Sequence, residues 1–379
     1  MKSDPADLRE LVVCSLEPWN DTWRRNQFLV HNLLEQHRHL RVLFIEPPAD
    51  PIYDLATRHL PALPRLRSVT RDRRLQRFRP LKPLPRRAGP IADRLLLAQI
   101  PPVVRLLGFD APVLWLNDVN YAPLIAATGW PTVYDITDDW LLAPTAAAEL
   151  ARLQHLEAVA LRDAEEVVVC SDALVASRSQ WRPVSLIRNA VDTEHFRRPQ
   201  PRPHALPHAP VAVYVGTLHD ARIDVELVLE LARGRRDMSI ALVGPDSLGP
   251  QTRARLNHEP NVHLLGSQPY DRVPAYLQHA DVLIVPHLVS SFTESLDPIK
   301  AYECLAVDTP TVATPVAGFR ELAGDVRVAD RKGFVEAVEA ALESPPRITP
   351  RTVPSWQERS EEFALLLQRA QRRRVEVAG

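Results

Sequence analysis

One run of residues combines several groups that bind phosphate and ribose. Residues 282–285 predict an apolar strand, and the polar loop after it ends at Asp297-Pro298, where an N-cap residue and a proline start a helix. Lys300 and Glu303 lie in the first two turns of that helix. Amides at a helix start and a lysine ammonium attract phosphate oxygens, and a carboxylate accepts hydrogen bonds from the two ribose hydroxyls. Asp297, Lys300 and Glu303 therefore predict a nucleotide site.

Gly216 offers a second place for a phosphate. The strand expected at 211–215 leads into this glycine, whose missing side chain lets the backbone approach a ligand, and a helix is expected to follow. Arg222 would add a positive charge for a diphosphate. The alternative is an ordinary strand-to-helix turn with a surface arginine.

Strands and helices alternate along the chain, which predicts parallel sheets covered by helices on both faces. In the first half, strands are expected at 11–15, 41–45, 113–116, 132–134, 167–170 and 185–187. In the second half, they are expected at 211–215, 240–243, 262–265, 282–285 and 311–313. Five prolines between 199 and 210 mark a linker. Two doubly wound units would place the carboxyl ends of their strands around a shared cleft.

Length and composition predict an ordinary globular protein of two domains. The chain has 379 residues, of which 45% are hydrophobic and 25% charged, and one core rarely organises more than about 300 residues. Cys14, Cys170 and Cys304 lack the spacing of a zinc site or a disulfide framework. Neither a signal-peptide pattern nor an apolar run of the roughly 20 residues needed to span a bilayer occurs, so we expect the protein to work in the cytoplasm.

The segment from Arg58 to Arg105 is strongly basic, although the whole chain has a formal net charge of −1. It holds thirteen lysines or arginines and only two acids, Asp72 and Asp93. A nucleic-acid arm is disfavoured because Phe78 is the only aromatic ring interleaved with these charges. The remaining interpretations are peripheral contact with the inner face of a membrane, a solvated arginine surface, and arginines that reflect only genomic base composition.

The nucleotide-binding segments also resemble a known family. Residues 189–196, Gly216 and its strand, the run from Asp297 to Glu303 and residues 308–322 follow the order and spacing of the group 1, family 4-like glycosyltransferases of GT-B fold. The Asp-Pro-Ile-Lys-Ala-Tyr-Glu run is most similar to enzymes of bacterial surface polysaccharide assembly, including the teichuronic acid and xanthan glucuronosyltransferase types. The resemblance covers about residues 189–322.

This resemblance implies a fold and an activity. The fold is α/β of the GT-B type, with two doubly wound Rossmann-like domains facing a central cleft. The activity is transfer of a sugar from a nucleotide-diphosphate sugar, with a UDP-sugar favoured, to an acceptor hydroxyl. The implied partners are that donor and a glycan, lipid-linked or small-molecule acceptor, and no nucleic acid.

The family pattern is altered at two positions. Family members usually carry two glutamates separated by seven residues, and here Ser295 stands where the partner of Glu303 would be, with Glu294 one position away. The frequent Gly-Arg-Leu of the family is Gly216-Thr217-Leu218, so Arg222 is expected to replace the usual diphosphate arginine. Retention or inversion of configuration therefore stays open.

The resemblance also implies a place for the nucleobase and a division into domains. Gly266, Ser267 and Gln268 match the loop where the family holds the base, with an ordinary turn as the alternative. An N-terminal acceptor-binding domain is expected at 1–198 and a nucleotide-sugar-binding domain at 199–350. A C-terminal helix within 351–379 is expected to cross back to the first domain.

Two segments of the first half are candidates for acceptor binding and catalysis. Trp19 and Arg24 resemble the tryptophan and Arg-x-x-Gln start of surface-polysaccharide transferases, and an indole can stack on a sugar ring; a core tryptophan is the alternative. Asp135, Asp138 and Asp139 follow a predicted strand, and one carboxylate could take the acceptor proton. Asp138 is the first choice and Asp135 the second, and a helix cap is the alternative for Asp138 or Asp139.

The expected chemistry uses no metal or other cofactor. The sequence has no Asp-x-Asp motif, and helix starts with Lys300 and Arg222 would stabilise the departing diphosphate. An epimerase would not need an aromatic acceptor loop, and a phosphorylase would need a lysine-bound pyridoxal phosphate. A non-catalytic GT-B-like binding or partner subunit is the alternative from another class, suggested by Ser295 and Thr217.

Overall fold

The protein divides into two compact units in the computed structural model, which describes residues 8–51, 65–85, 89–143, 145–344 and 351–378. Unit 1 comprises Met1–Ile187 and Gln357–Gly379, and unit 2 comprises Arg188–Trp356. The division falls before Arg188 and not after Arg198, so the proline-rich segment belongs to unit 2. Residues 345–350, where the second domain was expected to end, lie outside the described residues.

Unit 1 is built on an eight-stranded sheet with the order β3-β4-β2-β1-β5-β6-β7-β8. Its strands are β1 Glu10–Cys14, β2 Arg41–Ile45, β3 Arg65–Ser68, β4 Leu75–Arg79, β5 Val113–Leu116, β6 Thr132–Ile136, β7 Glu166–Val169 and β8 Ser185–Leu186. Strands β3 and β4 pair antiparallel, and the other neighbours pair parallel. The chain order reverses between β1 and β5, which is where doubly wound sheets bind ligands.

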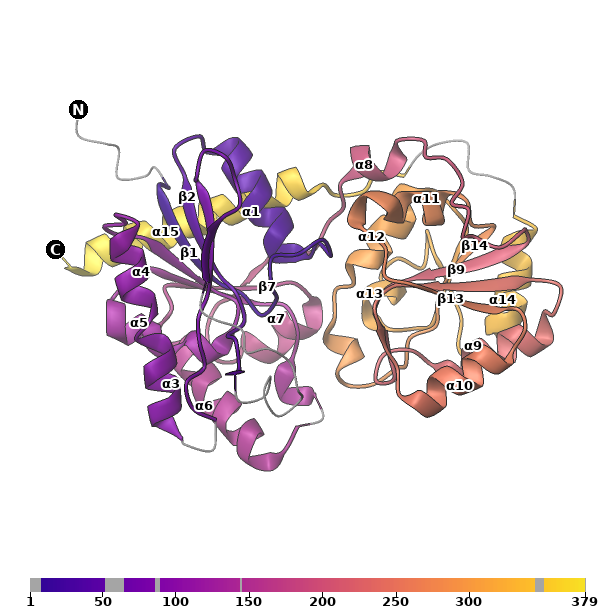
Figure 1. The fold of residues 1–379 in the computed structure, drawn as a ribbon, viewed down its shortest axis with the longest axis horizontal. Coiled ribbons are helices and arrows are strands. Elements are labelled where there is room, and N and C mark those ends of the chain that lie inside the picture. The colour runs from indigo at the N-terminus through magenta and orange to yellow at the C-terminus, as the bar shows by residue number, and fades with distance from the viewer. Residues whose placement is uncertain (1–7, 52–64, 86–88, 144, 345–350, 379) are drawn as a thin grey trace. The chain divides into compact units, whose positions relative to one another are not determined.

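Helices cover both faces of this sheet (Figure 1). They are α1 Arg25–Gln36, α3 Pro90–Leu97, α4 Ile100–Leu106, α5 Pro123–Thr128, α6 Ala147–Asp163, α7 Asp172–Arg178 and α15 Trp356–Ala378. Successive side chains of a strand point to opposite faces. Leu114 and Leu116 of β5 pack with α3 to α6 in one core, whereas Trp115 between them contacts Phe363 of α15, with ring centroids 4.4 Å apart. The C-terminal helix therefore completes the core of unit 1.

Unit 2 contains a six-stranded parallel sheet with the order β13-β11-β9-β14-β15-β16. Its strands are β9 Val211–Val215, β11 Ser239–Val243, β13 Val262–Gly266, β14 Val282–Val285, β15 Thr311–Ala313 and β16 Arg327–Val328. A separate pair consists of β10 Leu218–His219 and β12 Asp246–Ser247. Its helices are α8 Thr193–Arg197, α9 Val225–Gly234, α10 Pro250–His258, α11 Val273–Gln278, α12 Ile299–Ala306, α13 Ala317–Arg320 and α14 Phe334–Leu342. The chain order reverses between β9 and β14, and doubly wound sheets bind ligands at such a position, called the β9/β14 reversal below.

Sequence analysis missed the two-residue strands β10, β12 and β16, and it missed two longer strands in the arginine-rich segment. Strands β3 and β4 carry four arginines and few apolar side chains, so the alternation that marks a half-buried strand is weak. Phe78 of β4 supplies buried apolar contact at 6% exposure. Arg58, Arg86 and Arg87 of the same basic segment lie outside the described residues. Within the described part of the chain, no helix has the length and apolar character that crossing a membrane requires.

Candidate functional site

Three glycines line the carboxyl ends of neighbouring strands in unit 2. The amide of Gly216 donates to the carbonyl of Val243 at 2.8 Å, and the amide of Gly244 donates to the carbonyl of Gly266 at 2.8 Å. A Cβ on Gly244 would lie 1.9 Å from the Gly216 carbonyl oxygen, and a Cβ on Gly216 would lie 2.0 Å from Cε of Lys300. The absence of side chains therefore permits both the close backbone packing and the position of Lys300 over Gly216.

The start of α12 has no side-chain cap, and Pro298 is its N-cap residue. The predicted cap at Asp297 is wrong, because its carboxylate accepts from the backbone amide of Asn189 and from the hydroxyl of Tyr302, the latter at 2.8 Å. Asp297 thus fixes the loop before α12, and the structure assigns it to support of this loop instead of direct contact with a nucleotide.

Two titratable groups beside Lys300 have shifted pKa values. Burial, followed by the charges of Lys300 and Arg222, lowers the pKa of His287 to about 3, so its imidazole is neutral at pH 7. Its Nε2 lies 3.2 Å from the hydroxyl of Tyr214. Burial raises the pKa of Glu303, and the charge of Lys300 opposes that rise. His287 follows β14 and contacts Tyr214 of β9, so it bridges the two strands of the β9/β14 reversal. It was not identified from the sequence, although its position after a strand was an available signal.

Glu303 keeps a carboxylate available for a ligand. No hydrogen bond or salt bridge to its side chain occurs among the residues that the structure describes, and the side chain is half-buried. The two nearby candidates for a second family glutamate differ from it. Glu294 forms a two-pronged ion pair with Arg320, and the Ser295 hydroxyl donates to the carbonyl of Phe292 at 2.7 Å.

The segment after Gly216 differs from the expected strand-to-helix turn. Strand β10 intervenes, and α9 starts only at Val225, where the Asp224 carboxylate caps the amide of Leu227 at 3.1 Å. The predicted helix start next to Gly216 is therefore wrong. Arg222 still lies near the β9/β14 reversal, because its carbonyl accepts from the amide of Leu288 at 2.8 Å. Its guanidinium carbon sits 5.7 Å from the centroid of the Phe292 ring.

The loop predicted to hold a nucleobase lies at the carboxyl end of strand β13. Gly266 has a φ of +70°, which suits glycine in a tight turn. Ser267 is exposed, and the side-chain amide of Gln268 donates back to the carbonyl of Leu265 at 3.2 Å. These contacts shape the loop, and base binding by Gly266, Ser267 and Gln268 stays a prediction.

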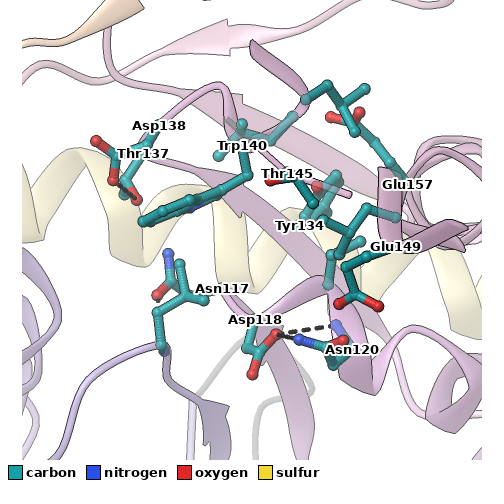
Figure 2. A pocket seen from close by; sticks show the side chains of 15 residues that line it. Asn117, Asp118, Asn120, Tyr134, Thr137, Asp138, Trp140, Thr145, Glu149 and Glu157 are labelled. Atoms are coloured by element: carbon teal, nitrogen blue, oxygen red, sulfur yellow. Dashed lines mark hydrogen bonds between the residues drawn. The ribbon is translucent and has the colours of Figure 1, made fainter. Parts of the chain in front are cut away.

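Unit 1 carries a pocket at the carboxyl ends of β1, β5 and β6, with a cavity volume of about 200 Å³ (Figure 2). Its lining consists of Leu16, Asn117, Asp118, Val119, Asn120, Tyr134, Ile136, Thr137, Asp138, Trp140, Leu141, Thr145, Glu149, Leu153 and Glu157. Asp138 and Thr137 lie together at one side, while Asp118 and Asn120 lie at another. The Asp118 carboxylate accepts from the Asn120 amide at 2.9 Å. Sequence analysis missed Asp118 and Asn120, although polar residues directly after a strand are the available signal.

Only one of the three predicted aspartates reaches this pocket. Asp135 is fully buried, and its Oδ2 accepts from Nε of Arg25 at 3.3 Å and from Nε1 of Trp115 at 3.2 Å. Asp139 is buried in an ion pair with Arg178. Neither carboxylate is available to an acceptor hydroxyl, so the structure disfavours Asp135 as the base. Asp138 lines the pocket, and the 3-10 helix after it has no side-chain cap.

Trp19 and Arg24 occupy the loop between β1 and α1. The backbone of Trp19 is fixed at both ends, since its amide donates to Glu46 at 3.0 Å and its carbonyl accepts from Arg77 at 2.8 Å. Its ring meets Phe44 edge-on, with centroids 5.1 Å apart. Arg24 is the residue before α1 and lies 3.5 Å from a carboxylate oxygen of Glu17. Trp19 is only partly buried, so its ring can still contact a ligand.

The described residues offer no metal site of protein side chains. No group of three or more histidine, cysteine, aspartate or glutamate side chains within the described ranges could hold a metal ion. Cys14, Cys170 and Cys304 are buried free thiols. Lys300 and Arg222 place positive charge near the β9/β14 reversal, and a reaction without a metal stays a prediction.

Part of the chain is similar to known glycosyltransferases. Residues 209–344 match the family of group 1 glycosyl transferases. The chain is 24% identical over 220 residues to TuaH of Bacillus subtilis (strain 168), which is provisionally named as a teichuronic acid biosynthesis glycosyltransferase. That match covers 53% of this chain and 55% of TuaH, so the chain spans about half the length of this relative.

Solved structures show the same fold over nearly the whole chain. An α,α-trehalose 6-phosphate synthase from Burkholderia multivorans superposes with a TM-score of 0.65 at 13% identity, over 98% of this chain and 100% of the other. A UDP-forming α,α-trehalose-phosphate synthase from Burkholderia xenovorans, in complex with glucose-6-phosphate, gives a TM-score of 0.64 at 11% identity over 96% of both chains. The chain has the GT-B fold, and residues 209–344 match the group 1 glycosyltransferase family, in agreement with the sequence resemblance.

Proposed function

We propose that this protein is a glycosyltransferase that moves a sugar from a nucleotide-diphosphate sugar to an acceptor hydroxyl. The observation that carries the proposal is the site at the β9/β14 reversal, where glycine backbone, an uncapped helix start, Lys300 and Glu303 converge within the group 1 domain. Ligands of open α/β sheets bind at this position. The arrangement suits a nucleotide with a diphosphate and free ribose hydroxyls.

Each group of the site has a distinct role in this proposal. The Gly216 backbone and the amides at the start of α12 approach the diphosphate, and Lys300 and Arg222 stabilise the charge that grows on it as the sugar departs. Glu303 accepts hydrogen bonds from the ribose diol. The uncharged His287 adds no further positive charge there. Because protein cations supply the positive charge, the proposed reaction uses no metal.

A UDP-sugar is the favoured donor. Two of the structures with the same fold are described as bound with UDP-2-fluoro glucose and as UDP-forming, and this supports the choice. The similarity to TuaH supports a surface polysaccharide or its precursor as the acceptor class. Activity in the cytoplasm, at the inner face of the membrane, remains a prediction that fractionation of the host cells would test.

The pocket of unit 1 is the proposed acceptor site. Asp138 would accept the proton of the attacking hydroxyl in an inverting reaction, a role that requires a carboxylate within hydrogen-bond reach of the substrate. Trp140 lines the same pocket and is 41% exposed, so its ring can contact a sugar. If configuration is retained, the donor phosphate accepts the proton and Asp138 is not required.

A donor screen tests the proposal directly. Purified protein is heated with UDP-, GDP-, dTDP- and ADP-sugars, and the preferred sugar is then followed for nucleotide release with candidate acceptors. We expect one nucleotide to raise the melting temperature, and Lys300→Ala to lower turnover more than acceptor affinity. A non-catalytic partner subunit would bind nucleotide sugars without releasing nucleotide under any acceptor condition, and failure of every nucleotide to bind would refute the donor site itself.

A further inference from the structure

Four arginines share one face of the β3/β4 hairpin in unit 1. In the antiparallel register Arg65 lies opposite Arg79, and Arg67 lies opposite Arg77. Residues two apart on a strand point to the same face, and directly opposed residues do as well. All four line one hollow of about 340 Å³ together with Pro18, Trp19, Asn20, Glu46 and Pro47.

This arrangement of like charges is unfavourable by itself. Like charges placed directly opposite each other destabilise an antiparallel pair. Within the described part of the chain, no hydrogen bond or ion pair holds the side chains of Arg65, Arg67 and Arg79, all of which are exposed. Glu46 is the only acid of the lining, and it already contacts Arg77 and the amide of Trp19. An anion in the hollow would relieve the repulsion.

One wall of the hollow is held in place. Glu46 is buried and follows β2, where it accepts from the Trp19 amide. Arg77 donates to the Trp19 carbonyl at 2.8 Å, and the Phe44 ring contacts the indole edge-on. The aromatic ring and the arginine face are thus positioned relative to each other before any ligand arrives, as a binding site requires.

The hollow lies at the same edge of the sheet as the proposed acceptor pocket. Strand β4 runs parallel to β2, so Arg79 at its carboxyl end reaches the edge where β1, β5 and β6 also end. The loop after β1 contributes Leu16 to the pocket and Trp19 to the hollow. A substrate that lies along this edge can therefore contact both places.

We propose that the four-arginine hollow binds a phosphate or diphosphate group carried by the acceptor substrate, with Trp19 against the ring next to it. Guanidinium groups match phosphate oxygens in paired hydrogen bonds, and several arginines suit a multiply charged group better than a single carboxylate. This inference rests on the proposed function, since it names the chemistry of the acceptor. The same phosphate chemistry occurs in lipid headgroups, and the experiment separates the two sources.

The test uses the full chain and pyrophosphate as the probe. Saturating UDP first blocks the diphosphate part of the donor site, and pyrophosphate is then titrated by calorimetry. Arg67→Gln/Arg79→Gln removes two hollow arginines and spares Arg77, which holds Trp19. The matched control, Arg71→Gln/Arg105→Gln, removes two exposed arginines of the same basic segment that do not line the hollow. Both variants lose the same charge.

We expect pyrophosphate to bind the wild-type protein and the control variant with similar affinity. Arg67→Gln/Arg79→Gln should bind at least about tenfold more weakly, because a hydrogen bond between charged groups contributes roughly a factor of ten or more. Added salt should weaken binding. Equal affinity of both double variants, or no pyrophosphate binding at all, would overturn the proposal.

Two further measurements separate related outcomes. The first is flotation with vesicles of phosphatidylcholine that contain one quarter phosphatidylglycerol, which should leave the protein unbound when pyrophosphate is present. Binding of the protein to these vesicles that pyrophosphate cannot displace would identify a lipid surface and overturn the acceptor site. The titration is repeated in Lys300→Ala. Hollow-dependent binding should persist there, which separates the hollow from the donor site. Pyrophosphate binding to the hollow of a wild-type protein that releases nucleotide from none of the nucleotide sugars would refute the proposed function and leave the anion site standing.

Discussion

Replacement of Glu303 by glutamine tests the donor site through two opposite effects. The side chain is half-buried, burial raises its pKa, and no described residue forms a hydrogen bond or salt bridge with it. A carboxylate kept in such surroundings costs stability and is retained where a ligand uses it. Glu303→Gln should therefore weaken nucleotide-sugar binding and at the same time stabilise the unliganded protein at neutral pH.

The magnitude of the binding loss follows from the bonds to the ribose. A hydrogen bond to a charged group contributes about 1.5 to 3 kcal/mol, which corresponds to a roughly 10- to 150-fold increase in the dissociation constant. The stability effect has a defined direction with pH. Because the folded pKa is raised, the folded state binds the extra proton, and wild-type stability falls as pH rises from about 4.5 through the folded pKa. The glutamine variant lacks this loss.

Calorimetry with the preferred nucleotide sugar gives the affinity, and urea unfolding at pH 4.5 and pH 7.5 gives the stability. The matched control is Glu336→Gln, an exposed glutamate of α14 in the same unit. Unchanged donor affinity of Glu303→Gln would remove Glu303 from the site. Equal weakening by both variants would show that net charge, and not the ribose contact, determines affinity.

Three further substitutions test the rest of the site. Asp138→Asn should leave folding intact and lower turnover by about a hundred to ten thousand fold if Asp138 is the base. Asp135→Asn should instead cost about 3 kcal/mol of stability, because it leaves the buried Arg25 without its charge partner. Kinetics and urea unfolding of both variants test these effects, and normal turnover of Asp138→Asn would favour a retaining mechanism. Gly216→Ala would place a Cβ 2.0 Å from Cε of Lys300 and 2.7 Å from the hydroxyl of Tyr214, at a φ of +158°. We therefore expect the Lys300 side chain to move, a loss of stability and at least about tenfold weaker donor binding. Calorimetry that finds wild-type affinity would contradict this prediction. The folded-state pKa of His287 is about 3, so the unfolded state takes up a proton below about pH 6.5 and the wild-type protein loses stability as the pH is lowered. Between pH 7.5 and pH 5, His287→Gln should lose about 2 kcal/mol less free energy of unfolding than the wild type does. Parallel stability curves of the two proteins would argue against a neutral buried imidazole.

Local sequence pattern was sufficient for most strands of the two sheets and for the candidate residues of the donor site. Apolar runs of four or five residues, separated by helical stretches, report burial on both faces, so the strands around Val113 and Val282 could be located without tertiary information. Gly216, Lys300 and Glu303 could also be identified, because glycine after a strand and charged residues at a helix start are features of adjacent residues. The family comparison agrees with this part of the chain.

Only the tertiary structure decided which charged groups remain available. Asp135 and Asp138 are three residues apart and look equivalent in the sequence, yet Arg25, 110 residues from Asp135, neutralises one of them. Asp297 meets Asn189, 108 residues away, and so supports a loop instead of capping α12. The sequence showed that the segment containing β3 and β4 is basic, but it did not show that four of its arginines share one face of the hairpin. Such outcomes depend on partners distant in the chain, because an ion pair or a strand register is set by packing and not by local periodicity.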